Sequence, residues 1–103
     1  MYKLTYFVPE THLESTKAAI FEAGAGRIGD YDCCAWQTRG QGQFRPLAGS
    51  QPFLGRAGDL EFVEEFRVEL VCDDPFIRPA VLALKQAHPY EEPAYEVYRL
   101  ETI

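Results

Sequence analysis

The chain has 103 residues, of which 47% are hydrophobic and 25% are charged, and these values are typical of one globular domain with a single core. Its 16 acidic residues outnumber its 10 basic residues, which gives a formal net charge of −6. This balance excludes a nucleic-acid partner, because binding to a phosphate backbone requires a basic surface. No apolar stretch reaches the roughly 18 residues that a membrane span needs, so we expect no contact with a membrane.

The N-terminal residues and the cysteines indicate a cytoplasmic location. The opening sequence MYKLTYFVPE lacks the basic lead and the apolar block of a secretory signal. The three cysteines, Cys33, Cys34 and Cys72, are odd in number and have no C-x-x-C spacing. This spacing argues against a disulfide framework or a thiolate zinc site.

Residues 2–8 are rich in aromatic and β-branched types, which predicts a β-strand that Pro9 ends. The side chains on one face of this strand are Tyr2, Leu4, Tyr6 and Val8. Thr11 and Glu14 then form a capping-box pattern, which predicts the start of a helix. Apolar residues at helical spacing continue this helix to Gly24.

Residues 24–29 read GAGRIG, which matches the G-x-G-x-x-G pattern of dinucleotide-binding turns. In such a site a strand precedes the glycines, and an acidic residue follows about 20 positions later. Here a helix precedes them, and residues 45–50 contain no acid. The glycines therefore predict the end of the helix and a tight return into the next strand, with no nucleotide bound.

That next strand is predicted over residues 28–40. Neighbouring residues of a strand point to opposite faces, so Cys33 and Cys34 are not expected to share one metal ion. We expect at least one of them to be a small core residue.

Residues Gly40–Gly58 contain five glycines and two prolines, which predicts a long irregular loop. Its apolar side chains are Phe44, Leu47, Phe53 and Leu54. A fully solvated linker would not need them, so they either fold back onto the sheet or meet a protein partner such as a neighbouring subunit.

Residues 59–74 show the clearest strand alternation of the chain. The apolar face comprises Phe62, Phe66, Val68, Leu70 and Cys72. The opposite face comprises Glu61, Glu65, Arg67 and Glu69. We interpret these acids as a solvated outer face rather than a catalytic carboxylate pair.

Asp73 or Asp74 is expected to cap a second helix, with Pro75 in its first turn. The buried stripe of this helix is predicted to be Ile77, Ala80, Val81, Leu84 and His88. The chain then ends in a last strand within residues 90–103, with Pro93 near its beginning. The sequence predicts one α+β domain over residues 1–103, ferredoxin-like in its βαββαβ order, with a four-stranded antiparallel sheet and two helices on one face.

Residues 87–98, AHPYEEPAYEVY, carry the strongest candidate for chemistry. His88, Glu91 and Glu92 offer nitrogen and oxygen ligands to a divalent metal ion. A purely structural interpretation competes, because an imidazole at a helix C-terminus interacts well with the last carbonyls and Pro89 stops the helix.

The segment HPYEEPAYEVY resembles the closing motif of the PII-like domain inserted in Nif-three-like proteins, and its H-P-Y-E-x-P part is similar to the signature of CutA-type proteins. The segments AIFEAGAGRIGDYDCCAW, GQGQFRP, QPFLGRAG and LEFVEEFRVE resemble further parts of that insert in the same order. The resemblance covers the whole chain, which is similar to the insert in free-standing form.

The resemblance implies a small binding or regulatory domain that self-associates, with threefold symmetry favoured, and a long loop that reaches toward partners. It implies no two-metal site, since the larger halves that supply one in Nif-three-like proteins have no counterpart in these 103 residues. The basic phosphate-binding motif of nucleotide-binding PII proteins is not evident either.

Two functions remain as alternatives. The first is a non-enzymatic binding module, with a small ligand or a divalent metal ion near His88, Glu91 and Glu92. The second is a metal-dependent hydrolase that uses His88 with Glu91 or Glu92, although no catalytic constellation of diagnostic spacing supports it. For self-association we expect the charged sheet face to be open, with aromatic anchors. These anchors are Trp36, Tyr95 and Tyr98.

Overall fold

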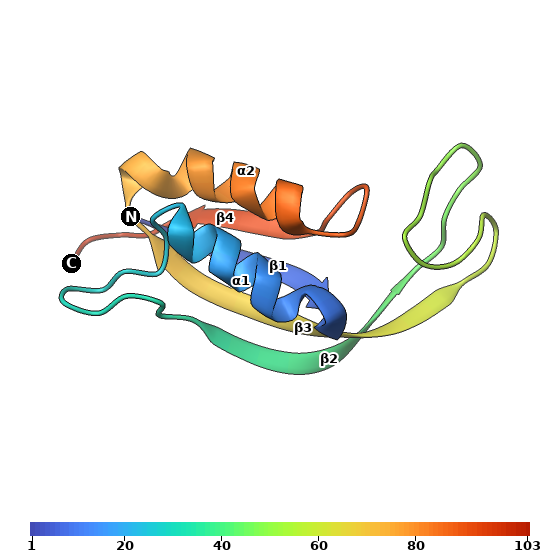
Figure 1. Cartoon of the computed structure of the whole chain (residues 1–103), viewed down its shortest axis with the longest axis horizontal. Coiled ribbons are helices and arrows are strands. Elements are labelled where there is room, and N and C mark those ends of the chain that lie inside the picture. Colours follow the sequence, from blue (N-terminus) through green and yellow to red (C-terminus); the bar gives the residue numbers. More distant parts are fainter.

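Four antiparallel strands form one sheet, and two helices lie side by side over one of its faces (Figure 1). The computed structural model describes residues 1–103. The elements are β1 (Tyr2–Pro9), α1 (Leu13–Glu22), β2 (Trp36–Phe44), β3 (Glu61–Cys72), α2 (Ile77–Ala87) and β4 (Tyr95–Arg99). The strand order is β2-β3-β1-β4, so the predicted βαββαβ fold is confirmed. Neither helix has the length and apolar character that crossing a bilayer requires.

The core lies between the helices and the sheet, where the predicted alternation holds. Its fully buried members include Leu4, Tyr6, Val8, Ile20, Val68, Cys72, Ala80 and Leu84. Tyr6 is the largest of these side chains, and its hydroxyl is 2.9 Å from Thr16 Oγ1 on α1. Burial raises the pKa of Tyr6 to about 12, so this phenol stays neutral and hydrogen-bonded inside the core.

Both helices begin later than the capping patterns predict. Short 3₁₀ turns at Glu10–His12 and Asp74–Phe76 come first, and no side chain caps either helix. The predicted Thr11 cap is wrong, because its hydroxyl lies 2.8 Å from His12 Nδ1 instead. The Asp73/Asp74 cap is wrong as well, and the Asp74 carboxylate pairs with the N-terminal amine.

The glycines after α1 form the predicted turn. Gly24 and Gly26 have φ of 110° and 79°, a left-handed region that side chains rarely adopt. The turn is tied to the sheet, because the Gly26 N–H donates to the Val71 carbonyl at 2.8 Å. A Cβ on Gly24 would lie 2.7 Å from the Phe76 ring, so the glycine also lets the end of α1 approach the start of α2.

The strand predicted from residue 28 begins only at Trp36, and residues 27–35 form a loop. Cys33 and Cys34 lie in this loop rather than on opposite faces of a strand, and Cys33 has φ of 54°. Neither of them is a core residue, whereas Cys72 is fully buried.

β2 and β3 continue beyond the body of the sheet as a two-stranded arm (Figure 1). β1 pairs with β3 only from Glu65 onward, so residues 61–64 pair with β2 alone. Gly40 and Gly42 belong to β2, and the irregular loop therefore spans residues 45–60 instead of 40–58. Phe62 is 56% exposed because it lies on the arm, outside the helix layer.

No helix covers the other face of the sheet, although its part nearest the arm lines the pocket described below and Thr5 on this face is only 2% exposed. The strand registers place there Lys3, Thr5, Phe7, Trp36, Phe44, Val63, Glu65, Arg67, Glu69 and Tyr98. This confirms the charged face with Trp36 and Tyr98 as aromatic members. Tyr95 is wrong as an anchor of this face, because it pairs with Tyr6 on the helix side and packs against the core.

Candidate ligand pocket

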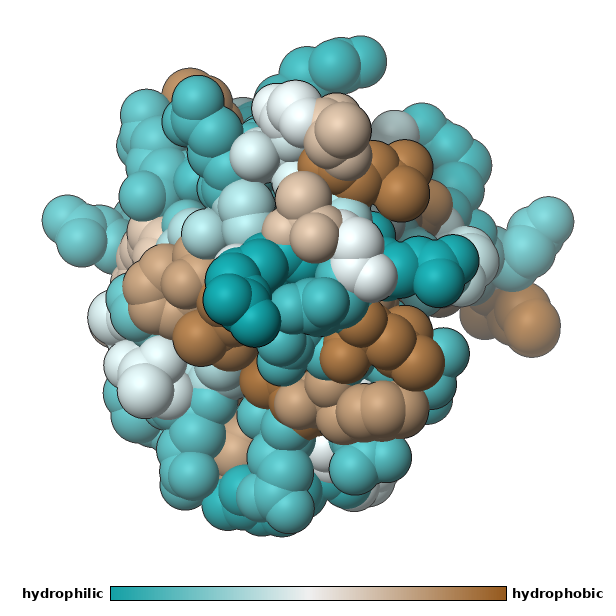
Figure 2. Space-filling model, turned by 90° about the vertical axis from the view of Figure 1, so that its right-hand side faces the viewer, coloured by the Kyte–Doolittle hydropathy of each residue, from teal (hydrophilic) through white to brown (hydrophobic).

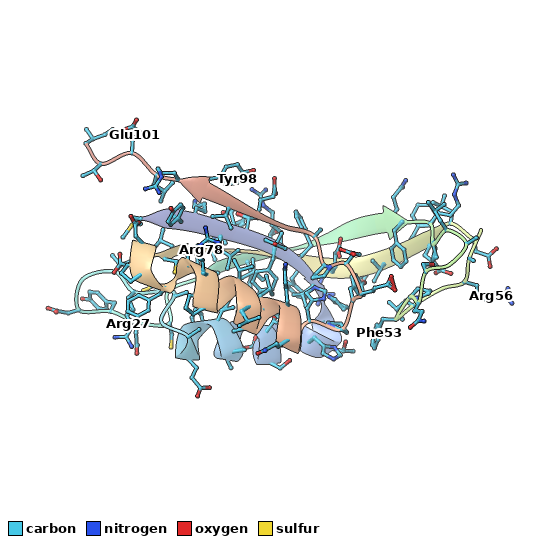
Figure 3. All side chains as sticks on the ribbon, turned by 90° about the horizontal axis from the view of Figure 1, so that it is seen from above. Arg27, Phe53, Arg56, Arg78, Tyr98 and Glu101 are labelled. Atoms are coloured by element: carbon cyan, nitrogen blue, oxygen red, sulfur yellow. The ribbon has the colours of Figure 1, made fainter.

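The base of the arm, the loop 45–60 and residues 90–94 line a pocket of about 570 Å³ that is partly open to solvent. This volume lies within the range of small-molecule sites. In Figure 3, Phe53 lies on the side of the loop that faces the body, whereas Arg56 points away from it. Figure 2 looks at this end of the molecule, where apolar side chains form patches separated by polar ones. The cavity thus brings together the two segments that the sequence singles out.

Aromatic side chains line much of the pocket around Tyr90. The centre of the Tyr90 ring is 6.0 Å from that of Phe44 and 6.2 Å from that of Phe53, and both pairs are tilted. Phe53 also meets the His12 ring edge to face at 5.6 Å. Such arrangements are favoured by the aromatic quadrupole, so they hold the loop against the body.

One polar contact joins the two loops. The Gln51 backbone N–H donates to Glu91 Oε2 at 2.8 Å. The Glu91 carboxylate is thereby used to order the loop 45–60 over the pocket, and this contact is charge-assisted.

Glu65 places a carboxylate in the pocket wall. The side chain is partly buried, and no ion pair of the structure includes it. Burial raises its pKa above the ordinary value. The carboxylate lies against Gly42, where an added Cβ would be 1.9 Å from Glu65 Oε1. Gly42 in β2 therefore provides the space that this acid occupies.

The Tyr90 hydroxyl is buried and has no hydrogen-bond partner. Burial is the largest cause of its raised pKa, and the negative charge of Glu65 adds to it. Tyr90 thus lies close enough to Glu65 for the charge of the carboxylate to act on its hydroxyl.

His88 connects three parts of the backbone. Its Nε2 donates to the Phe7 carbonyl at 2.6 Å, and its Nδ1 accepts from the Tyr90 N–H at 3.1 Å. A neutral imidazole with its proton on Nε2 satisfies both contacts. Burial is the main reason that its pKa lies below the ordinary value, while the Phe7 bond opposes the shift.

The structure brings Glu91 and Glu92 to the pocket beside Glu65, but it does not turn the His88 nitrogens toward them. No three His, Cys, Asp or Glu side chains gather closely enough to hold a metal ion. Metal binding by His88, Glu91 and Glu92 stays a prediction, and it would require His88 to leave a backbone partner.

Sequence reasoning missed Glu65 and Gly42 as parts of the site. Glu65 looked like one more charge on a solvated face, and Gly42 like a loop residue. A glycine inside a strand often marks a close approach of other atoms, but this signal was hidden because Gly42 was assigned to the loop and not to β2.

Comparison with protein-family models finds no match. Among curated proteins, the chain is 45% identical over 100 residues to a "GTP cyclohydrolase 1 type 2 homolog" of Halalkalibacterium halodurans, covering 97% of this chain and 27% of that protein. A protein of the same name from Bacillus subtilis is 43% identical over 99 residues, covering 96% and 26%. The chain therefore spans about a quarter of the length of these relatives.

Among solved structures, a Bacillus cereus protein related to NIF3 matches with a TM-score of 0.84 and 42% identity, over 98% of this chain and 26% of that one. CutA1 from Pyrococcus horikoshii matches with a TM-score of 0.70 over 100% of this chain and 86% of its own. At 16% identity, this second likeness shows the fold alone. Over 98% of its length the chain thus resembles a segment that makes up about a quarter of a NIF3-related protein, and its fold is similar to that of CutA.

Proposed function

We propose that this domain is a non-catalytic binding module that takes a small ligand in the pocket between the arm, the loop 45–60 and residues 90–94. The cavity of about 570 Å³ carries the proposal. It has the mixture that ligand sites usually have, an apolar aromatic lining with a few polar groups. The loop that closes it is held by one hydrogen bond and ring contacts, so it can admit a ligand without disturbing the core.

The hydrolase alternative has weaker support. A general base must reach the proton that it abstracts, but both ring nitrogens of His88 engage backbone groups. Glu91 is engaged with the Gln51 N–H. The name of the curated relatives concerns proteins about four times as long, and cyclohydrolase chemistry is not part of this proposal.

A fragment screen by two-dimensional ¹H–¹⁵N NMR tests the binding function. We expect at least one compound to shift the amide signals of Gly42, Phe53 and Tyr90 together and saturably. Leu82→Ala, a substitution on α2 outside this pocket, should leave these shifts and their saturation unchanged. If compounds shift only residues elsewhere, or none, the pocket is not a binding site.

We also propose that the domain self-associates, with a trimer favoured by its likeness to CutA and PII proteins. The supporting observation is the exposure of β2, a nine-residue edge strand with Trp36 59% exposed. Long uncovered edges pair readily with other chains.

The loop 45–60 is a second candidate surface for a protein partner. The three free cysteines fit a reducing cytoplasm.

A further inference from the structure

We propose that the ligand of this pocket is an organic cation, an ammonium group carried on a small aromatic or apolar body. This inference rests on the proposed function, because it names the class of ligand for the same pocket.

The charges around the cavity favour a cation. Glu65, Glu91 and Glu92 line it, and Arg45 is the single basic residue among its lining side chains. Glu65 is the important member, because it is partly buried and has no ion pair. A carboxylate in this state gains more from a cationic partner than an exposed one does, since the surrounding protein screens the attraction less than water.

The aromatic lining favours the same ligand. Phe44, Phe53 and Tyr90 meet at tilted angles rather than in a flat stack. Ring faces attract cations through their quadrupole, and several rings around one space are the usual way in which proteins bind organic ammonium groups. The rings also supply the apolar surface that the body of such a ligand would cover.

Gly42 maintains this arrangement. Its lack of a Cβ leaves the space in which the Glu65 carboxylate lies. Gly40 stands two residues earlier in the same strand and on the same face, and a Cβ there would meet nothing within 4 Å. The two glycines are therefore chemically matched, and only one of them determines where the acid lies.

The test compares three probes of similar shape, phenethylammonium, 2-phenylethanol and phenylacetate, by NMR titration of the full chain near neutral pH. We expect phenethylammonium to bind at the pocket about tenfold more tightly than 2-phenylethanol, and phenylacetate to bind most weakly. Glu65→Gln should weaken phenethylammonium about tenfold, whereas Glu64→Gln should change it less than twofold. Glu64 is the matched control, because it changes the net charge equally from the opposite face of β3.

The glycine pair provides a second, independent arm. Gly42→Ala should weaken phenethylammonium severalfold by displacing the Glu65 carboxylate without removing its charge, and Gly40→Ala should not. If Glu64→Gln weakens binding as much as Glu65→Gln, attraction to the acidic surface explains it and the inference is wrong. If the neutral or anionic probe binds the pocket best, the ligand class is wrong while the binding function stands. If neither these probes nor the fragment screen shifts the pocket residues, both fail.

Discussion

His88 is buried at the end of α2 and joins this helix to β1 and to the segment before β4. Both of its ring nitrogens are used, one as donor to the Phe7 carbonyl and one as acceptor from the Tyr90 N–H. A protonated ring would carry a second N–H, which would face the Tyr90 donor. The neutral ring is therefore part of the fold.

We predict that the imidazole of His88 titrates below 6.5 in the folded protein. The unfolded chain then binds a proton more readily than the folded one, so this contribution to stability is complete above about pH 6.5 and is lost as the pH falls through the lower folded pKa. NMR titration of His12→Ala, in which His88 is the remaining imidazole, measures the pKa. A value at or above 6.5 would contradict the prediction.

His88→Ala should lower the free energy of unfolding by about 1–3 kcal/mol, because the Phe7 carbonyl loses its partner. Denaturant unfolding measures the change, with His12→Ala as the control.

Titration of the unmodified chain, His88→Ala and Glu91→Gln with Zn²⁺ tests the metal hypothesis. Binding that His88→Ala or Glu91→Gln abolishes in an otherwise folded protein would support a metal site here.

Alanine substitutions at Gly24 and Gly29 distinguish the cost of the backbone conformation from the cost of a packing contact. Both have positive φ, but an added Cβ meets the Phe76 ring only at Gly24. Each alanine should cost roughly 1–2 kcal/mol for the left-handed conformation. Gly24→Ala should cost about 1–3 kcal/mol more, because the Phe76 ring must move. Thermal unfolding of the two variants gives the difference, and equal melting temperatures would show that the contact is unimportant.

Among the elements, the loop 45–60 is long, yet it adds little to the core. Pro46 is its one buried residue, and its main contacts are the ring pairs of Phe53 and the Gln51–Glu91 hydrogen bond. The loop therefore forms one wall of the pocket without supporting the fold.

We predict that replacing residues 45–60 by a four-residue Gly-Ser link leaves the protein folded. The link still joins Phe44 to Glu61, the last pair of the arm. Closure entropy changes slowly with loop length, so the free energy of unfolding should change by about 1 kcal/mol or less. Circular dichroism and thermal unfolding check this, and ligand binding should be lost. An unfolded product would show that the loop is part of the core.

Element types could be predicted from the sequence, but several boundaries could not. The alternation around Val68 and Leu70 encodes burial directly, so β3 and its core face were confirmed. Thr11 carries the local signal of a helix cap, yet the chain leaves β1 through a 3₁₀ turn at Glu10–His12 before α1 begins. Local patterns do not contain such tertiary constraints.

The site was harder to predict for the same reason. The segment 88–94 was recognised by its residue types, and the structure places part of it at the pocket. Gly42 and Glu65 come from two strands whose pairing register decides that they meet. The register of two strands cannot be read from a single sequence, so the contact between Gly42 and Glu65 could be identified only in the structure.

At the scale of the whole molecule, the sheet face without helices and the edge strand β2 remain largely uncovered in one chain. Trp36 lies on both features and is 59% exposed, and Tyr98 on the same face is 51% exposed. Large aromatic residues are the usual anchors of subunit contacts.

We predict that the purified chain is an oligomer at micromolar concentration, and that Trp36→Glu weakens its association at least about tenfold. Leu82→Glu is the matched control, since Leu82 is 57% exposed on α2, on the helix layer. Sedimentation equilibrium measures both. A single species at the 11.7 kDa chain mass would end the proposal, and a dimer would keep the interface but reject threefold symmetry.

The arm also gives the molecule two regions of different local stability. Residues 61–64 pair with β2 alone, and an isolated pair of strands is only marginally stable in water. The arm can therefore open and close while the core remains protected from exchange with solvent. Gly42 and Phe44 lie on the arm, whereas Tyr90 lies on the body, so a ligand in the pocket would contact both regions. Binding would therefore slow the exchange of backbone amide hydrogens at the base of the arm.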